Sequence, residues 1–173
     1  ERSRYFGEKV TIDWIVEDTP MGTGGSVANA INVLELSGSV LVSNADTWLD
    51  GGLKQVINSD KPAVVGVIAV NDARRYGLVS IDKDKYVMSF VEKQTHVISK
   101  IPGIINAGLY KLPVNAFLDV GRVDFSLEEE ILASLSSKKL LNAEILKGHF
   151  FDIGVPEDYY KFCDWHKLEQ NNG

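Results

Sequence analysis

"PMGTGGSVANAINVLELSGSVLVSNAD" (residues 20–46) contains, in order, a glycine-rich turn, an amphipathic stretch and an apolar run that ends at a carboxylate. Ser26 is a residue type that caps helices, and from Val27 onward apolar residues recur at the i, i+3, i+4, i+7 spacing of one helix face. Gly38 is a typical helix stop. The stretch therefore predicts a turn, a helix and then a buried strand over residues 39–46.

The alternation of helical and strand patterns continues along the rest of the chain. Strands are predicted at residues 10–17, 63–70, 103–113 and 149–154, with a hairpin at residues 76–93 around the charged turn 82–85. Helices are predicted at residues 50–61, 125–135 and 155–170, the second with Ser126 and Glu129 as a capping box. This order predicts an α/β fold with three layers and a mixed, mostly parallel sheet, formed by residues 1–173 as a single domain.

The composition indicates a globular protein without a polyanionic partner. The 173 residues carry a net charge of -6 and contain no basic block, which argues against binding to nucleic acid. The apolar runs are too short to cross a membrane. The single cysteine, Cys163, allows no internal disulfide. A cytoplasmic protein with small-molecule partners is therefore expected, with a homodimer as an option.

Two carboxylates follow predicted strands and are candidate metal ligands. Ligands of open α/β sheets bind beyond the carboxyl ends of the strands, and Asp46 and Asp152 both lie at such ends. Two carboxylates there suit a Mg²⁺ ion held over nucleotide phosphates. Each has another interpretation: Asp46 could cap a helix that contains Thr47 and Asp50, and Asp152 is ambiguous when taken alone.

Glycine, asparagine and lysine residues provide further candidates for binding a substrate. The turn of Gly22, Thr23, Gly24 and Gly25 could offer backbone N–H groups at a helix N-terminus. Lys93 could contact a phosphate, or it could be a solvated strand end. Asn106 and Gly108 interrupt a strand, which indicates either close approach of a ligand or a β-bulge.

Six segments in this order resemble the sugar-nucleotide pyrophosphorylases, which are nucleotidyltransferases with a GT-A-like α/β fold. The segments are "EDTPMGTGGSVANA", "VSNAD", "RRYGLVSIDKDKYVMSFVEK", "INAGLYKL", "FSLEEEIL" and "FFDIGVPEDY". Within the family the sequence is similar to guanylyltransferases of mannose-type sugar 1-phosphates. "FSLEEE" and "FFDIGVPEDYY" favour the branch that acts on D-glycero-D-manno-heptose 1-phosphate.

The resemblance implies that an NTP and a sugar 1-phosphate react to give an NDP-sugar and pyrophosphate. It implies that Asp46 and Asp152 hold Mg²⁺ and that the glycine turn contacts the base. It also places Asn44 beside the nucleotide. The remaining residues that it implies hold the sugar phosphate are Glu92, Lys93, Asn106 and Gly108. Asp46, Lys93 and Asp152 would be the catalytic residues.

One departure from the family pattern concerns the start of the chain. Members begin with a strand and a glycine-rich phosphate loop that ends in Thr-Arg-Leu, and this sequence begins where the third strand is expected. The fragment alone is therefore expected to be inactive. Three alternatives stay open: a non-catalytic regulatory or scaffolding relative, a GT-A glycosyltransferase, and a thymidylyl- or uridylyltransferase.

Overall fold

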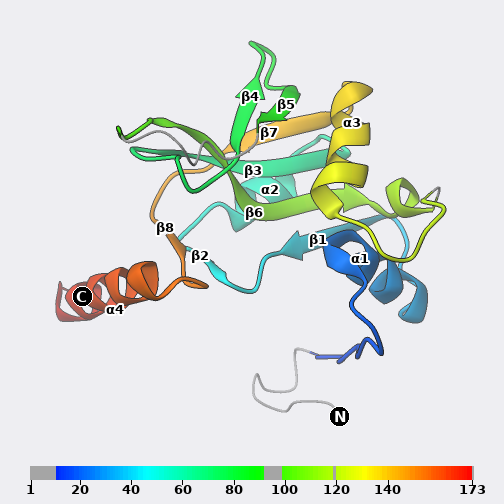
Figure 1. Cartoon of the computed structure of the whole chain (residues 1–173), viewed down its shortest axis with the longest axis horizontal. Coiled ribbons are helices and arrows are strands. Elements are labelled where there is room, and N and C mark those ends of the chain that lie inside the picture. Colours follow the sequence, from blue (N-terminus) through cyan, green and yellow to red (C-terminus); the bar gives the residue numbers. More distant parts are fainter. Residues whose placement is uncertain (1–10, 92–98, 119, 173) are drawn as a thin grey trace.

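The computed structural model describes residues 11–91, 99–118 and 120–172, and Figure 1 shows how they are arranged. The helices are α1 (Gly22–Val33), α2 (Leu53–Asn58), α3 (Ala133–Ser137) and α4 (Pro156–Asn172), with the short 3₁₀-helix η2 (Val114–Phe117) and the short π-helix η3 (Leu127–Leu132), which continues into α3. The strands are β1 (Ser39–Ser43), β2 (Thr47–Leu49), β3 (Ala63–Val70), β4 (Leu78–Ile81), β5 (Val87–Val91), β6 (Gly103–Pro113), β7 (Leu141–Ile145) and β8 (Phe150–Asp152).

The main sheet is built around β6, its longest strand. The strand order is β5-β4-β6-β3-β7, and β1 also pairs with β6, near the end of that strand. The pairing of β3 with β7 is parallel, whereas the other pairings described in this sheet are antiparallel. The expected mixed α/β sheet is confirmed, but its described pairings are mostly antiparallel and not mostly parallel, because β3–β7 is the single parallel pair among them. A separate ribbon is formed by β2 and β8.

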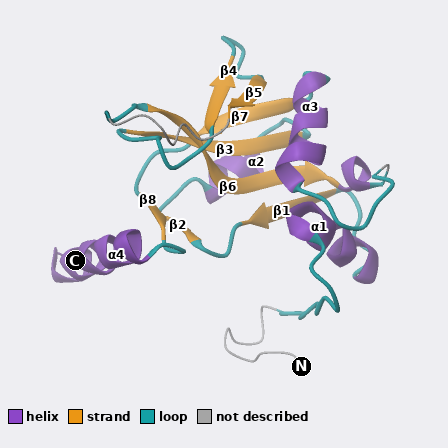
Figure 2. Cartoon of the chain, viewed as in Figure 1, coloured by secondary structure: helices purple, strands orange, loops and turns teal. Residues whose placement is uncertain are grey.

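Helices cover both faces of the main sheet, so the predicted three-layer architecture is confirmed (Figure 2). One core joins α1, η3 and α3 to the sheet through Ile31, Tyr110 and Ile131. The other joins α2 to the opposite face through Val56 and Ile105. The first six residues of β3 are buried, as its unbroken apolar run predicts for a strand covered on both sides.

The strand predicted for residues 10–17 is wrong where the structure describes it. Residues 11–17 have no regular secondary structure, and Trp14 and Val16 are exposed to 68% and 85%. A strand needs a partner for its backbone groups, and within the described residues this segment pairs with none. Its β-branched composition alone therefore does not produce a strand.

Helix α1 begins five residues earlier than predicted, because the expected glycine turn is already helical. Met21 occupies the N-cap position and Gly22 is the first residue of the helix. Ser26 is not the cap: its Oγ donates a hydrogen bond of 2.8 Å to the carbonyl of Gly22, one turn back. The helix ends at Val33, five residues before Gly38, whose φ of +76° fits a turn.

Other predicted elements are confirmed, with one correction for burial. The hairpin around residues 82–85 forms, and so do α2, β8 and α4. The Ser126 hydroxyl accepts a hydrogen bond of 3.2 Å from the amide of Glu129, so the predicted N-cap is correct. Strand β1 exists but is not buried, because it pairs only with β6 among the described strands and Leu41 is 44% exposed.

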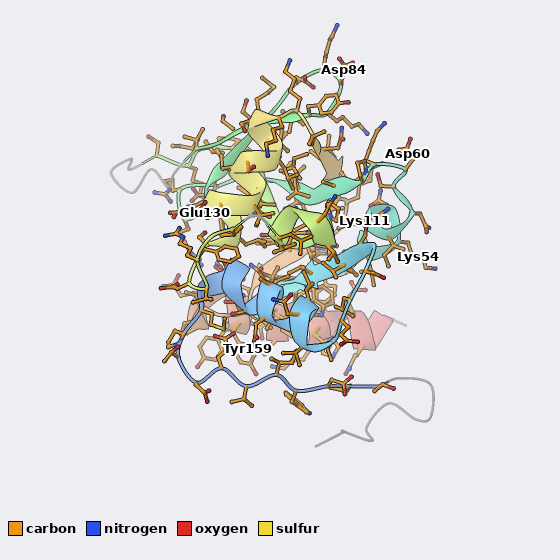
Figure 3. The ribbon with its side chains drawn as sticks, turned by 90° about the vertical axis from the view of Figure 1, so that its right-hand side faces the viewer. Lys54, Asp60, Asp84, Lys111, Glu130 and Tyr159 are labelled. Carbon is orange, nitrogen blue, oxygen red and sulfur yellow. The ribbon has the colours of Figure 1, made fainter. Side chains whose placement is uncertain are left out.

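The carboxyl end of α2 is fixed by a lysine from the main sheet. Lys111 Nζ donates to the carbonyls of Ile57 at 3.2 Å and Ser59 at 2.7 Å (Figure 3). Carbonyls in the last turn of a helix lack partners within the helix, and a cation there is favourable. Among the described helices, none combines the length and the apolar character needed to cross a membrane.

Candidate functional site

The end of β1 meets the middle of β6, and this junction carries two of the predicted site residues. The amide of Asn44, the first residue after β1, donates a hydrogen bond of 2.8 Å to the carbonyl of Gly108. Gly108 has a φ of +70°, a backbone region that glycine adopts without strain. The predicted neighbours of the substrate, Asn44 and Gly108, are therefore in direct contact.

Asn106 and Gly108 lie at a bulge inside β6, where Asn106 is half-buried and Gly108 is buried. Tyr110 lies opposite Val65 and Asn106 lies opposite Val67, so β6 has extra residues between these pairs. The side-chain Oδ1 of Asn106 accepts a hydrogen bond of 3.0 Å from the amide of Gly108. The interpretation of this motif as a bulge is correct, and its role in binding a sugar stays a prediction.

A hydrogen-bond network connects the bulge to α1 and η3, and its centre is Glu128. Tyr110, whose side chain is fully buried, accepts from Asn106 Nδ2 at 2.8 Å and donates to Glu128 Oε1 at 3.4 Å. Glu128 Oε2 accepts from Thr23 Oγ1 at 3.1 Å and from Ser126 Oγ at 3.2 Å. Burial, reinforced by the Glu128 charge, raises the pKa of Tyr110, so the phenol stays protonated as a donor.

Glu128 and Tyr110 were not among the residues predicted from the sequence. Glu128 is the middle member of the motif "SLEEE" at residues 126–130, where only the helix cap was recognised. Its partner Thr23 is 105 positions away in the chain, and nothing in the local pattern indicates that contact. The network shows that the Thr23 hydroxyl is bonded to Glu128 inside the protein. Direct contact between Thr23 and substrate remains a prediction.

The glycines at the start of α1 permit close packing between α1 and residues 123–127. A side chain on Gly24 would lie 2.4 Å from the Phe125 ring, and one on Gly22 would lie 2.6 Å from the Phe125 carbonyl oxygen. That same carbonyl accepts from the amides of Gly24 at 3.0 Å and Gly25 at 3.3 Å. These two N–H groups, which were expected to be available to a ligand, therefore have a partner inside the protein.

Asp46 lies in the turn directly before β2, next to the position that pairs with Asp152 in the β2–β8 ribbon. Thr47 pairs with Asp152, and Thr47 directly follows Asp46. The Asp46 carbonyl accepts a hydrogen bond of 3.2 Å from the amide of Gly154, where a side chain would lie 2.8 Å from Asp46 Oδ2. Because Thr47 begins a strand, the alternative that Asp46 caps a helix is wrong.

Asp152 forms an ion pair with an arginine that was not predicted from the sequence. Arg75 lies in the loop between β3 and β4, and its NH2 group is 3.1 Å from Asp152 Oδ2. The Asp152 side chain remains 29% exposed. Its charge is thus partly compensated, while the side chain keeps partial access to solvent.

The metal site expected from the sequence rests on two carboxylates. The described segments contain no group of three or more His, Cys, Asp or Glu residues arranged to bind a metal ion. The donor set at the ribbon is therefore Asp46 and Asp152. That set suits Mg²⁺, which proteins bind through one or two carboxylates together with water and substrate phosphates. Two other predicted site residues, Glu92 and Lys93, lie outside the described residues.

Comparison with known proteins agrees with this architecture. The profile of the family described as "Nucleotidyl transferase" matches residues 2–166. The D-glycero-alpha-D-manno-heptose 1-phosphate guanylyltransferase of Campylobacter jejuni is 34% identical over 161 residues, which are 91% of this chain and 70% of the relative. The mannose-1-phosphate guanylyltransferase catalytic subunit beta of Drosophila pseudoobscura is 30% identical, over 83% of this chain and 39% of that subunit.

A solved structure supports the same relationship. The crystal structure of HddC from Yersinia pseudotuberculosis superposes with a TM-score of 0.77 at 36% identity, over 89% of this chain and 66% of HddC. A second structure of that protein is complexed with GMP-PN and has a TM-score of 0.75. The chain thus spans 70%, 66% and 39% of the lengths of these three relatives. The profile match over nearly the whole chain and the identity to the Campylobacter relative show that the chain belongs to the nucleotidyl transferase family.

Proposed function

We propose that the protein containing these residues is a guanylyltransferase that joins GTP and a sugar 1-phosphate of the heptose or mannose type. The products would be a GDP-sugar and pyrophosphate. The names of the Campylobacter and Drosophila relatives support the choice of base and sugar. The observation that carries the proposal is the contact of Asn44 with Gly108 of β6, two residues before Asp46, which lies in the turn beside the Thr47–Asp152 pair.

The reaction is an in-line substitution at phosphorus. A phosphate oxygen of the sugar 1-phosphate forms a bond to the α-phosphorus of GTP. The bond from that phosphorus to the oxygen bridging to the β-phosphate breaks, and pyrophosphate leaves with the electron pair. No covalent enzyme intermediate is needed, so the protein contributes positioning and stabilisation of charge.

Different residues would serve the metal ion, the nucleotide and the sugar phosphate. Asp46 and Asp152 would hold Mg²⁺, which supplies neutralisation and orientation of the phosphates when bound. Asn44 and the start of α1 would lie beside the nucleotide. The sugar phosphate would contact Asn106 and Gly108, with Glu92 and Lys93 from the adjoining segment. Lys93 would provide a point charge for a phosphate.

This activity is proposed for the full-length protein and not for the 173 residues alone. We propose that residues 1–173 form one nucleotidyltransferase domain that is incomplete for catalysis. A cytoplasmic location fits such substrates. The full-length protein and the 173-residue segment should be assayed side by side, and robust turnover by the segment would contradict the proposed incompleteness.

The test is pyrophosphate release by the full-length protein with a panel of GTP, UTP, dTTP and ATP against mannose, heptose and glucose 1-phosphates. Release with GTP and a manno-configured sugar phosphate is expected. Asp46→Asn should lower turnover by roughly 100-fold or more, because it removes a charged ligand. Asp60→Asn is the control, since its side chain is 85% exposed on the outer surface (Figure 3). No release with any pair would favour a non-catalytic relative.

A further inference from the structure

Arg75 contacts two carboxylates that are far from it in the sequence. Its NH2 group lies 3.1 Å from Asp152 Oδ2, and its NH1 group lies 2.6 Å from Asp158 Oδ2. Asp152 ends β8 and Asp158 belongs to the first turn of α4. One planar guanidinium therefore joins the ribbon, the loop before β4 and the terminal helix, and Figure 1 shows how α4 follows the ribbon.

Asp158 is the better anchored of the two carboxylates. It is 7% exposed, and it also accepts from Lys161 Nζ at 2.7 Å and Tyr76 OH at 3.5 Å. Burial raises the pKa of Asp158, but the hydrogen bonds and charges of Lys161 and Arg75 lower it further, so its pKa lies below the usual 3.8. Asp152 has only Arg75 as an ion-pair partner among the described residues, and it stays 29% exposed.

We propose that Arg75 is a positioning residue that holds the Asp152 carboxylate at the edge of the ribbon. The positive charge of its guanidinium group is shared between Asp152 and Asp158. The proposal rests on the proposed function, because it concerns how Asp152 is oriented and how strongly it attracts a divalent cation. Arg75 does not touch substrate in this role. It acts through Asp152, and Asp158 acts through Arg75.

The charges of the trio determine how each member affects a cation at Asp152. Arg75 lowers the negative potential at Asp152 and therefore competes with a metal ion. The negative charge of Asp158 offsets part of the positive potential that the guanidinium group creates at Asp152, and so weakens that competition. Removing Arg75 should tighten binding of a free cation, whereas removing the Asp158 charge should loosen it. A purely structural role for the trio gives no reason for these opposite signs.

The experiment measures Mn²⁺ alone, by the EPR signal of the free ion, titrated into the full-length protein. Arg75→Gln should bind Mn²⁺ roughly three- to tenfold more tightly than the wild type, and Asp158→Asn roughly three- to tenfold more weakly. The matched control is Arg122→Gln, which removes an arginine paired with Glu130 of η3 and should leave the affinity unchanged. Circular dichroism melts establish that each variant is folded.

Turnover provides a second readout, because the orientation of the Asp152 carboxylate should affect kcat independently of the affinity for the ion. Arg75→Gln should have a lower kcat although it binds the ion more tightly, since the carboxylate is no longer oriented. Arg75→Lys should restore charge but not the two-pronged contact, and should regain only part of kcat. Equal shifts of the same sign in Arg75→Gln and Asp158→Asn, or no shift in either, would overturn the proposal.

The outcomes also distinguish this proposal from the proposed function. If the wild type binds no Mn²⁺, or if Asp46→Asn leaves Mn²⁺ affinity unchanged, the metal assignment itself fails. If the wild type binds Mn²⁺ through Asp46 but the Arg75 and Asp158 variants do not shift in opposite directions, only the role of Arg75 fails.

Discussion

The backbone of Asn44 is hydrogen-bonded to Gly108, and its side chain fills the space where a side chain on Gly108 would lie. The N–O distance is 2.8 Å, and a Cβ atom on Gly108 would be 2.8 Å from both Cγ and Nδ2 of Asn44. Two constraints therefore require glycine at position 108: the backbone φ of +70° and the lack of space beside the Asn44 side chain. The junction between β1 and β6 depends on this pair.

Gly108→Ala should destabilise the protein by about 2–3 kcal/mol, because backbone strain of about 1 kcal/mol is added to a steric clash with Asn44. Urea denaturation measures this free energy of unfolding. Gly38→Ala is the control, since Gly38 has a φ of +76° and a Cβ atom there would meet no other atom within 4 Å. Equal losses in the two variants would show that the contact with Asn44 is unimportant for stability.

Glu128→Ala should cost about 1–3 kcal/mol of stability and also weaken substrate binding. The buried Tyr110 hydroxyl loses the acceptor for its proton, and Thr23 and Ser126 lose theirs. We expect KM to rise more than kcat falls, since the network positions Asn106 without touching the phosphates. Glu129→Ala changes an exposed acid one position away and should leave both constants close to wild type.

Gly24→Ala tests whether close packing outweighs helix propensity at the start of α1. Alanine favours a helix over glycine by about 1 kcal/mol. A Cβ atom would nevertheless lie 2.4 Å from the ring of Phe125, which is 4% exposed and packed in the core. We expect a net loss of about 1–3 kcal/mol in denaturant unfolding. A gain in stability would mean that the ring moves aside freely.

The pH dependence of stability should contain a contribution from Asp158. Its folded-state pKa is below 3.8, so the unfolded state takes up its proton first as the pH falls. The stabilisation is therefore complete above about pH 4 and is lost as the pH drops through the folded-state pKa. The difference in unfolding free energy between wild type and Asp158→Asn should shrink below about pH 4. A difference that stays constant from about pH 3 to about pH 7 would contradict this assignment.

Elements with strong local sequence signals were predictable from the sequence. The unbroken apolar run of β3, the hairpin turn and the cap at Ser126 all appear as expected. The strand predicted at residues 10–17 was wrong because β propensity does not supply a partner strand. Ser26 was misassigned because a glycine-rich sequence was taken for a turn, although contact with Phe125 allows Gly24 and Gly25 to be helical.

The candidate site was only partly predictable, for a different reason. Asp46, Asp152, Asn106 and Gly108 follow or interrupt strands, and that position can be read locally. Glu128 and Arg75 join segments that lie 105 and 77 positions apart. Contacts over such distances depend on how the layers pack, and no local periodicity encodes them.

Four aromatic side chains of the β2–β8 ribbon and α4 pack together: Trp48, Phe151, Phe162 and Trp165. This cluster supplies an intrinsic optical probe. Trp48 follows Asp46 closely in the chain, and its ring centroid lies 4.6 Å from that of Trp165 on α4. Trp14 is 68% exposed and should contribute a constant, solvent-like emission. A shift in the fluorescence of Trp48 and Trp165 would therefore report movement between the ribbon and α4 in the unlabelled protein.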